Sequence, residues 1–353
     1  MRFLVATSAS GAERLSAPLL GVPVALRAVQ AATAAGATKI EVSGPEAARV
    51  LQFASDPRVT VPLVAFEPSR EERVVVEGNA IVAPDLLRAL RPGEALLSDT
   101  DQLVAARRVF EPGDKPSTPL RGLPIMDVPR TAKLYAVLIQ DDGDVARARR
   151  ALLLAQGHPA DPPWTRRLLR PLTARLAGVL ASAGVRPTAA SLTALVFAVI
   201  SAWLLTLSSG AGAGMAALTL WVTAVFASVD GDLARLSLRE SEFGAALDRV
   251  VSDSARILAC VGALIGLARS ASAPWVHLVG ATGVLFWFGV QLLRRDLGPV
   301  PPSLIRTLLH RDTVLAVVAA LAVANFRWPL VILWPLFAAG ELALVLQSRR
   351  TTQ

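Results

Sequence analysis

The second half of the chain is built from long apolar stretches separated by short polar connections. A helix needs about 20 apolar residues to cross the roughly 30 Å hydrocarbon layer of a membrane. The stretches that approach or exceed this length lie at residues 189–207, 212–235, 244–268, 274–292, 306–325 and 328–347. This pattern predicts an all-α domain of six transmembrane helices.

Arginines occur mainly on alternate connections between these stretches. Arg170 and Arg175 precede the first stretch, the next connection has no basic residue, and Arg235 and Arg239 flank the one after it. Basic residues are enriched on the cytosolic side of membrane proteins. The pattern predicts a multi-pass protein of a bacterial-type inner (cytoplasmic) membrane. Both termini and the connection between the second and third helices are expected to be cytosolic.

Residues 164–179 precede the first membrane stretch and place arginines on one side of a helix and leucines on the other. This pattern is typical of an amphipathic helix that lies at a membrane interface. The alternative is a charged linker with no preference for the interface.

The first half of the chain alternates short β-type runs with helical patterns. Strands are expected at residues 2–7, 40–43, 74–76 and 80–82, and helices at 17–36 and 83–90, with Gly36 as a helix cap. Such alternation predicts a soluble α/β domain with a largely parallel sheet. We therefore expect an α/β domain at 1–150, a linker with the interfacial helix at 151–185, and the membrane domain at 186–353.

Charge supports this division of the chain. Residues 1–160 contain 19 Lys and Arg against 18 Asp and Glu, whereas residues 161–353 contain 17 against 10. The excess behind the net charge of +8 therefore lies beside the apolar stretches. Membrane topology and anionic lipid explain that location better than a nucleic-acid partner does.

The stretch Asp230–Arg235 reads D-G-D-L-A-R and is followed by Gly244 and Asp248. Acidic residues are costly in apolar spans, where they must be hydrated, paired or bound to metal. The spacing resembles the signature D-x-x-D-G-x-x-A-R-x8-G-x-x-x-D-x-x-x-D of CDP-alcohol phosphatidyltransferases, which are membrane enzymes of phospholipid synthesis. The first and last acidic positions of that signature are Ala227 and Ser252 in this chain.

The resemblance implies a site at which Mg²⁺ or Mn²⁺ bridges the diphosphate of a CDP-alcohol. It assigns metal binding to Asp230 and Asp248. The positions that it places around the nucleotide are Gly231, Ala234, Arg235 and Gly244. Ser252 is a poor general base, so the catalytic candidates are Asp248 and the neighbouring Asp253. On a regular helix, however, Asp253 stands about 140° away from Asp248.

Two functions follow from this resemblance. The first is transfer of a phospho-alcohol group from a CDP-alcohol, of the CDP-diacylglycerol or CDP-inositol type, to a hydroxyl acceptor with release of CMP. The second is a catalytically lapsed family member that binds a nucleotide, a lipid or another subunit, because two motif acids are absent. A further alternative is that the acids simply pair with Arg235, Arg249 and Arg256 as packing charges. The family also commonly forms homodimers.

The segment from Pro18 to Val42 is similar to the start of nucleotidyltransferases that activate sugar or polyol phosphates. In that family a glycine-rich loop holds the triphosphate, a lysine follows, and an aspartate binds metal. The corresponding positions here are Ser8–Arg14 with one glycine, Ala17 and Asn79. The resemblance therefore implies an inactive domain. The order of the two domains resembles bifunctional inositol-phosphate cytidylyltransferase/di-myo-inositol phosphate phosphate synthases.

Overall fold

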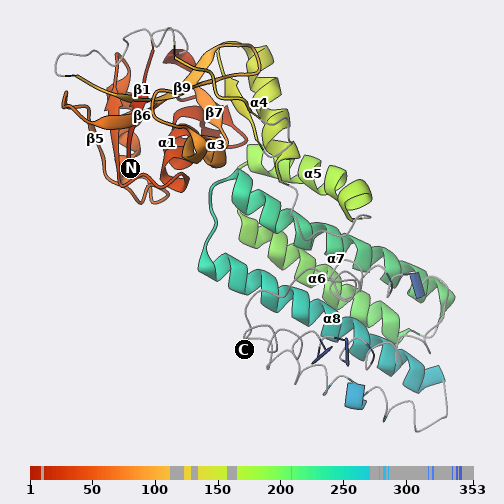
Figure 1. Ribbon diagram of the computed structural model, residues 1–353. Helices are drawn as coiled ribbons and strands as arrows, with labels where there is room; N and C mark the ends of the chain where they lie inside the picture. The colour runs from red at the N-terminus through yellow and green to blue at the C-terminus, as the bar shows by residue number, and fades with distance from the viewer. Residues whose placement is uncertain are drawn as a thin grey trace. The chain divides into compact units, whose positions relative to one another are not determined.

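The computed structural model describes residues 1–8, 12–111, 123–128, 134–156, 165–207 and 209–270, with isolated positions after these (Figure 1). The chain divides into two compact units. The first comprises Met1–Gln156 together with Gly178–Val185 and Ala234–Arg239. The second comprises Gly157–Ala177, Arg186–Leu233 and Glu240–Gln353.

A mixed β-sheet forms the centre of the first unit. Within the described residues it has six strands in the order β5-β4-β1-β6-β9-β8. The strands β5, β4, β1 and β6 run parallel, whereas β9 is antiparallel to β6 and β8. The expected α/β domain with a largely parallel sheet is confirmed. The strands of this sheet are β1 (Arg2–Ala6), β4 (Lys39–Ser43), β5 (Leu63–Ala65), β6 (Glu72–Glu77), β8 (Ala95–Leu97) and β9 (Leu103–Val109).

Alternate residues of the central strands pack against helices on one face of the sheet. Phe3 and Val5 of β1 share a core with Ala28 and Val29 of α1 and Leu86 of α3. The remaining elements of this unit are η1 (Ala12–Arg14), β2 (Pro18–Leu19), β3 (Val22–Pro23), α1 (Val24–Ala34), α2 (Ala47–Leu51), η2 (Gln52–Ser55), β7 (Ala80–Val82), α3 (Pro84–Ala89), β10 (Ala136–Leu138) and α4 (Asp142–Leu154).

The helix expected at residues 17–36 begins later than its sequence pattern indicated. Pro18–Leu19 pairs antiparallel with Val22–Pro23, and the turn between them contains Gly21 at a φ of +73°. Glycine adopts this backbone region without steric cost. The hairpin occupies the first part of the predicted helix, so α1 starts at Val24. Gly36 has a φ of +97°, in agreement with its expected role after the helix.

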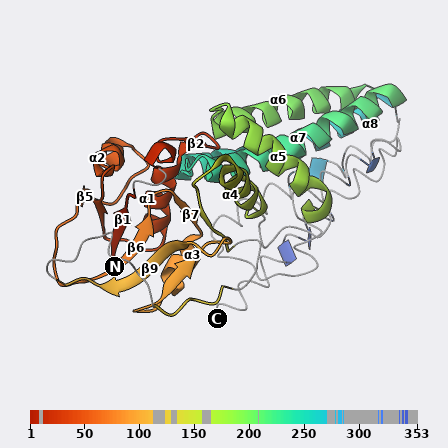
Figure 2. The same cartoon turned by 90° about the horizontal axis from the view of Figure 1, so that it is seen from above.

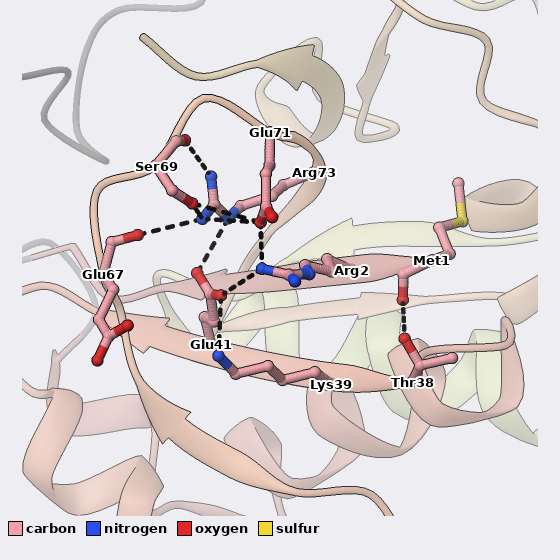
Figure 3. Close-up of polar contacts among 9 residues, drawn as sticks. All are labelled: Met1, Arg2, Thr38, Lys39, Glu41, Glu67, Ser69, Glu71 and Arg73. Carbon is pink, nitrogen blue, oxygen red and sulfur yellow. Dashed lines mark hydrogen bonds and ion pairs between the residues drawn. The ribbon is translucent and has the colours of Figure 1, made fainter. Parts of the chain in front are cut away.

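The other face of the sheet contains a cluster of charges around the buried pair of Arg73 and Glu41 (Figure 3). The Arg73 side chain is fully buried and donates from Nε to Glu41 Oε2 at 2.9 Å. Lys39 Nζ lies 3.5 Å from Glu41 Oε1, and Arg2 pairs with Glu71. Buried charges are tolerated when they are paired and hydrogen-bonded. This cluster therefore stabilises the sheet only while its charges stay matched.

Glu77 ends β6 next to Ala6 of β1. Among the described residues, no hydrogen bond reaches the buried Glu77 Oε2. Burial raises the pKa of Glu77 from 4.5 to about 7. Because the folded pKa lies above the unfolded value, the folded state binds the extra proton between these two values. Stability therefore falls as the pH rises from 4.5 to 7, and the whole penalty is present above pH 7.

We expect Glu77→Gln to raise the stability of the first unit by roughly 1–3 kcal/mol at pH 8.5 and to change it little below pH 4.5. Hydrogen exchange at β1 and β6 in the full chain measures this difference across the pH range. Glu72→Gln serves as a control, because the Glu72 carboxylate is half-buried and paired with Arg107 at 2.9 Å. A gain for Glu77→Gln that does not vary with pH would contradict the assignment of the penalty to the ionised carboxylate.

The second unit is helical. Its elements are the π-helix η3 (Thr165–Leu169), α5 (Arg170–Ser182), α6 (Pro187–Thr206), α7 (Gly210–Leu236) and α8 (Glu242–Ser270), although the ends of α5 and α7 belong to the first unit. In the described part of the chain, α6, α7 and α8 are long and apolar enough to cross a membrane. They coincide with the first three predicted spans, whereas the other three spans lie outside the described ranges. Helix also covers the predicted interfacial segment, from Thr165 onward.

Helices α6, α7 and α8 lie side by side in both views (Figures 1 and 2). Ala194, Ala227 and Val251 form one buried layer with a residue from each helix. Small residues allow such helices to approach closely. At Gly262 of α8, an added Cβ would lie 2.4 Å from the Ala202 carbonyl oxygen of α6. A side chain at Gly262 would therefore force the two helices apart.

Candidate functional site

The two motif acids lie in one layer of the helical bundle. Helices α7 and α8 are joined by a short connection and run antiparallel, and Ala227 and Val251 belong to one buried cluster with Ala194 of α6. Asp230 comes three residues after Ala227, and Asp248 comes three residues before Val251. Both acids are therefore displaced by about 4.5 Å along their helices from this cluster toward the connection. The Ser191 hydroxyl of α6 donates to Asp230 Oδ2 at 2.7 Å, so α6 contributes to the same layer.

Asp230 is 4% exposed, and its environment accounts for its ability to stay in an apolar helix. Its Oδ2 accepts from Ser191, and its Oδ1 accepts from the Gly231 backbone N–H at 2.5 Å. These hydrogen bonds satisfy acceptor atoms of a carboxylate that burial removes from water. Ser191 was absent from the sequence-based site. The signal that could have found it is a hydroxyl at the end of an apolar span, because polar groups there need a partner.

Asp232 lies about 200° around α7 from Asp230. Its side chain is fully buried and accepts from Arg170 Nη1 at 2.8 and 3.1 Å. Arg170 is the first residue of α5, so this ion pair joins the predicted interfacial helix to the motif helix within the second unit. The sequence indicated arginine partners for these acids but not Arg170, because the partner lies 62 residues away in the chain.

Asp248 and Ser252 lie one turn apart on α8, and the Ser252 hydroxyl donates to Asp248 Oδ1 at 3.4 Å. Asp253 instead accepts from Arg256 Nη2 at 2.8 Å, and its side chain is 38% exposed. Helix α8 is a regular α-helix from Glu242 to Ser270, so no bulge turns Asp253 toward Asp248. The pairing of Asp253 with Arg256 agrees with the packing-charge alternative for that acid.

The remaining motif positions occupy the helix ends beside this layer. Gly244 is in the first turn of α8, where its N–H donates to the Ser241 hydroxyl at 3.0 Å. Ala234 and Arg235 are in the last turn of α7, and Arg235 Nε donates to Gln156 Oε1 at 3.0 Å within the first unit. The roles that the resemblance gives to Gly231, Ala234, Arg235 and Gly244 stay predictions.

The helices that contain these residues fall within a segment that matches a known enzyme family. Residues 186–345 match the family model of CDP-alcohol phosphatidyltransferases. The match supports phospho-alcohol transfer from a CDP-alcohol in general. No match was found among curated proteins.

The family generally uses Mg²⁺ or Mn²⁺, which its motif acids hold. Ala227 and Ser252 leave Asp230 and Asp248 as the remaining acids at the four motif positions. In the part of the chain that the structure describes, no group of three His, Cys, Asp or Glu side chains is arranged to hold a metal ion. The residues present therefore do not fit the four-acid cluster, and metal binding by Asp230 and Asp248 stays a prediction.

The family match begins at residue 186 and does not cover the sheet-containing part of the first unit. Its predicted nucleotide-binding positions include Asn79, which is buried and donates from Nδ2 to the Ile139 carbonyl at 2.9 Å. Ala17 lies next to the β2–β3 hairpin, and part of the Ser8–Arg14 segment lies outside the described residues. Asn79 thus has a structural hydrogen bond where the resembled family has a metal ligand.

Proposed function

We propose that residues 186–345 form a divergent CDP-alcohol phosphotransferase site. The acceptor hydroxyl would attack the alcohol phosphate of the CDP-alcohol, and the bond from that phosphorus to the oxygen of CMP would break. The proton of the acceptor would pass to a carboxylate, for which Asp253 is our candidate. The hydrogen bond from Ser191 to the buried Asp230 carboxylate is the observation that carries this proposal, together with the family match.

The donor is proposed to be of the CDP-diacylglycerol or CDP-inositol type. A cytosolic site at the connection between α7 and α8 would give it access to a water-soluble nucleotide, as the arginine distribution predicts. The products would then enter phospholipid or polyol-phosphate synthesis. An anionic donor headgroup is consistent with the basic excess of residues 161–353.

Turnover by the purified full chain in lipid nanodiscs tests this function. The protein is supplied with CDP-diacylglycerol or CDP-inositol, a panel of polyol acceptors, and Mg²⁺ or Mn²⁺. We expect release of CMP that requires both an acceptor and the folded protein. Release that is independent of acceptor would indicate hydrolysis and would contradict group transfer.

The second candidate is a lapsed family member, favoured by Ala227 and Ser252 at two motif acid positions. Such a protein would bind a CDP-alcohol without turnover. CDP would then raise the thermal stability of the chain, and Asp230→Ala would abolish this shift although CMP release is absent from both proteins. The two measurements together separate the transferase from the binding protein.

A further inference from the structure

The matched motif of this chain has lost negative charge at two positions. Ala227 is buried at 3% exposure in the layer with Ala194 and Val251, and Ser252 has a hydroxyl where the family has its last acid. A diphosphate carries negative charge of its own and needs positive groups to enter a low-dielectric site. In the family, metal ions held by the motif acids supply these. A site with fewer acids needs another cation for the same ligand.

Arg256 is a cation in the required region of the bundle. It is 8% exposed and lies on α8 one turn beyond Ser252 and two turns beyond Asp248. Its Nε donates to the Ser252 carbonyl at 3.4 Å, and its Nη2 donates to Asp253 at 2.8 Å. Side chains of a helix lean toward its N-terminus, and these contacts show that the guanidinium does so here. The guanidinium is therefore nearer to Asp248 than the Cα atom of Arg256 is.

The position of this guanidinium along the helix axes can be related to residues of α7. Its two partners, Ser252 and Asp253, come directly after Val251, which belongs to the same buried cluster as Ala227 and Ala194. The guanidinium thus lies within about one helical turn of the layer that contains Ala227. This is the level at which the family has its first acid.

We propose that Arg256 binds a phosphate group of the CDP-alcohol diphosphate directly, and so supplies positive charge that the family obtains from metal. This inference rests on the proposed function of the same site. A guanidinium matches phosphate oxygens with two parallel hydrogen bonds. Asp253 neutralises Arg256 in the absence of ligand. Binding of the phosphate would release the Asp253 carboxylate, which is then available to the acceptor.

Binding of CDP to the full chain in nanodiscs tests this inference, with excess EDTA in one arm and Mg²⁺ in the other. For the unchanged protein we expect the two dissociation constants to agree within about 10-fold. In EDTA, Arg256→Gln should weaken CDP binding by roughly 10- to 100-fold, because a hydrogen-bonded charge is lost. Arg269→Gln is the matched control on the exposed far end of α8 and should leave CDP binding unchanged.

Two further variants keep the test valid if Arg256→Gln does not fold. Arg256→Lys retains the charge but not the paired donors, so it should bind CDP in EDTA with an intermediate affinity. Asp253→Asn/Arg256→Gln removes both charges of the pair and should fold while binding CDP as weakly as the single variant.

The outcomes separate this inference from the function on which it rests. If the unchanged protein binds CDP in Mg²⁺ but not in EDTA, and Arg256→Gln binds equally well in Mg²⁺, the role of Arg256 is overturned and the proposed function stands. If the unchanged protein binds CDP in neither arm, the proposed function is overturned together with the inference.

Discussion

Asp232→Ala is expected to destabilise the second unit by about 3–5 kcal/mol, because it removes the carboxylate that accepts hydrogen bonds from the largely buried Arg170 guanidinium. The Asp232 side chain is fully buried and the Arg170 side chain is 17% exposed, so water can solvate the remaining guanidinium only in part. The change also removes the ion pair between α5 and the motif helix. Titration of the full chain with a denaturing detergent measures the loss as an earlier unfolding transition.

A double variant that removes both charges shows how much stability the ion pair itself contributes. The single variant also includes the destabilisation caused by removing one partner alone. Asp232→Asn/Arg170→Gln should recover most of the lost stability, because no unmatched charge remains. Glu240→Gln, an exposed acid after α7, should change stability by less than about 1 kcal/mol. If Asp232→Ala behaves like Glu240→Gln, the buried pair does not hold the two helices together.

Glu41→Gln is expected to lower the stability of the first unit by about 3–5 kcal/mol, since Arg73 would lose its main counter-charge in a fully buried position. Arg73 Nε lies 2.9 Å from Glu41, whereas Arg73 Nη2 lies 3.6 Å from Glu71 (Figure 3). The rings of Phe66 and Phe110 lie 5.2 and 5.4 Å from the guanidinium carbon and exclude water from it. Hydrogen exchange at β1, β4 and β6 in the full chain reports the change.

The matched double variant is Glu41→Gln/Arg73→Met, which removes both charges and keeps a long apolar side chain. It should be closer in stability to the unchanged protein than Glu41→Gln is. Equal losses in the single and double variants would mean that packing, rather than the unpaired charge, causes the effect.

The sequence predicted much of the fold because its periodic patterns are long. Three spans were located to within a few residues, since twenty apolar residues in a row have few alternative structures. The start of α1 was misjudged because the apolar residues of the hairpin at Pro18–Pro23 were taken as the first turns of the alanine-rich helix that follows. Two prolines and the turn at Gly21 override that pattern.

The candidate site was predicted only where spacing along one helix determines it. Asp230 and Asp248 were identified from the motif, and the shared cluster of Ala194, Ala227 and Val251 indicates that they lie at a similar level of the bundle. Ser191 and Arg170 were missed because their contacts with Asp230 and Asp232 join residues far apart in the chain. Helical spacing contains no information about such contacts, which depend on how the helices pack.

The dependence of CMP release on Asp248 tests the central claim most directly. Full-length protein in nanodiscs is compared with Asp248→Asn and with Glu240→Gln, using a CDP-alcohol and an acceptor. The transferase account predicts that Asp248→Asn lowers acceptor-dependent CMP release by roughly 10³-fold or more, whereas Glu240→Gln releases CMP at the rate of the unchanged protein. Equal CMP release by Asp248→Asn and the unchanged protein would contradict a catalytic site at the layer of Ser191, Asp230 and Asp248.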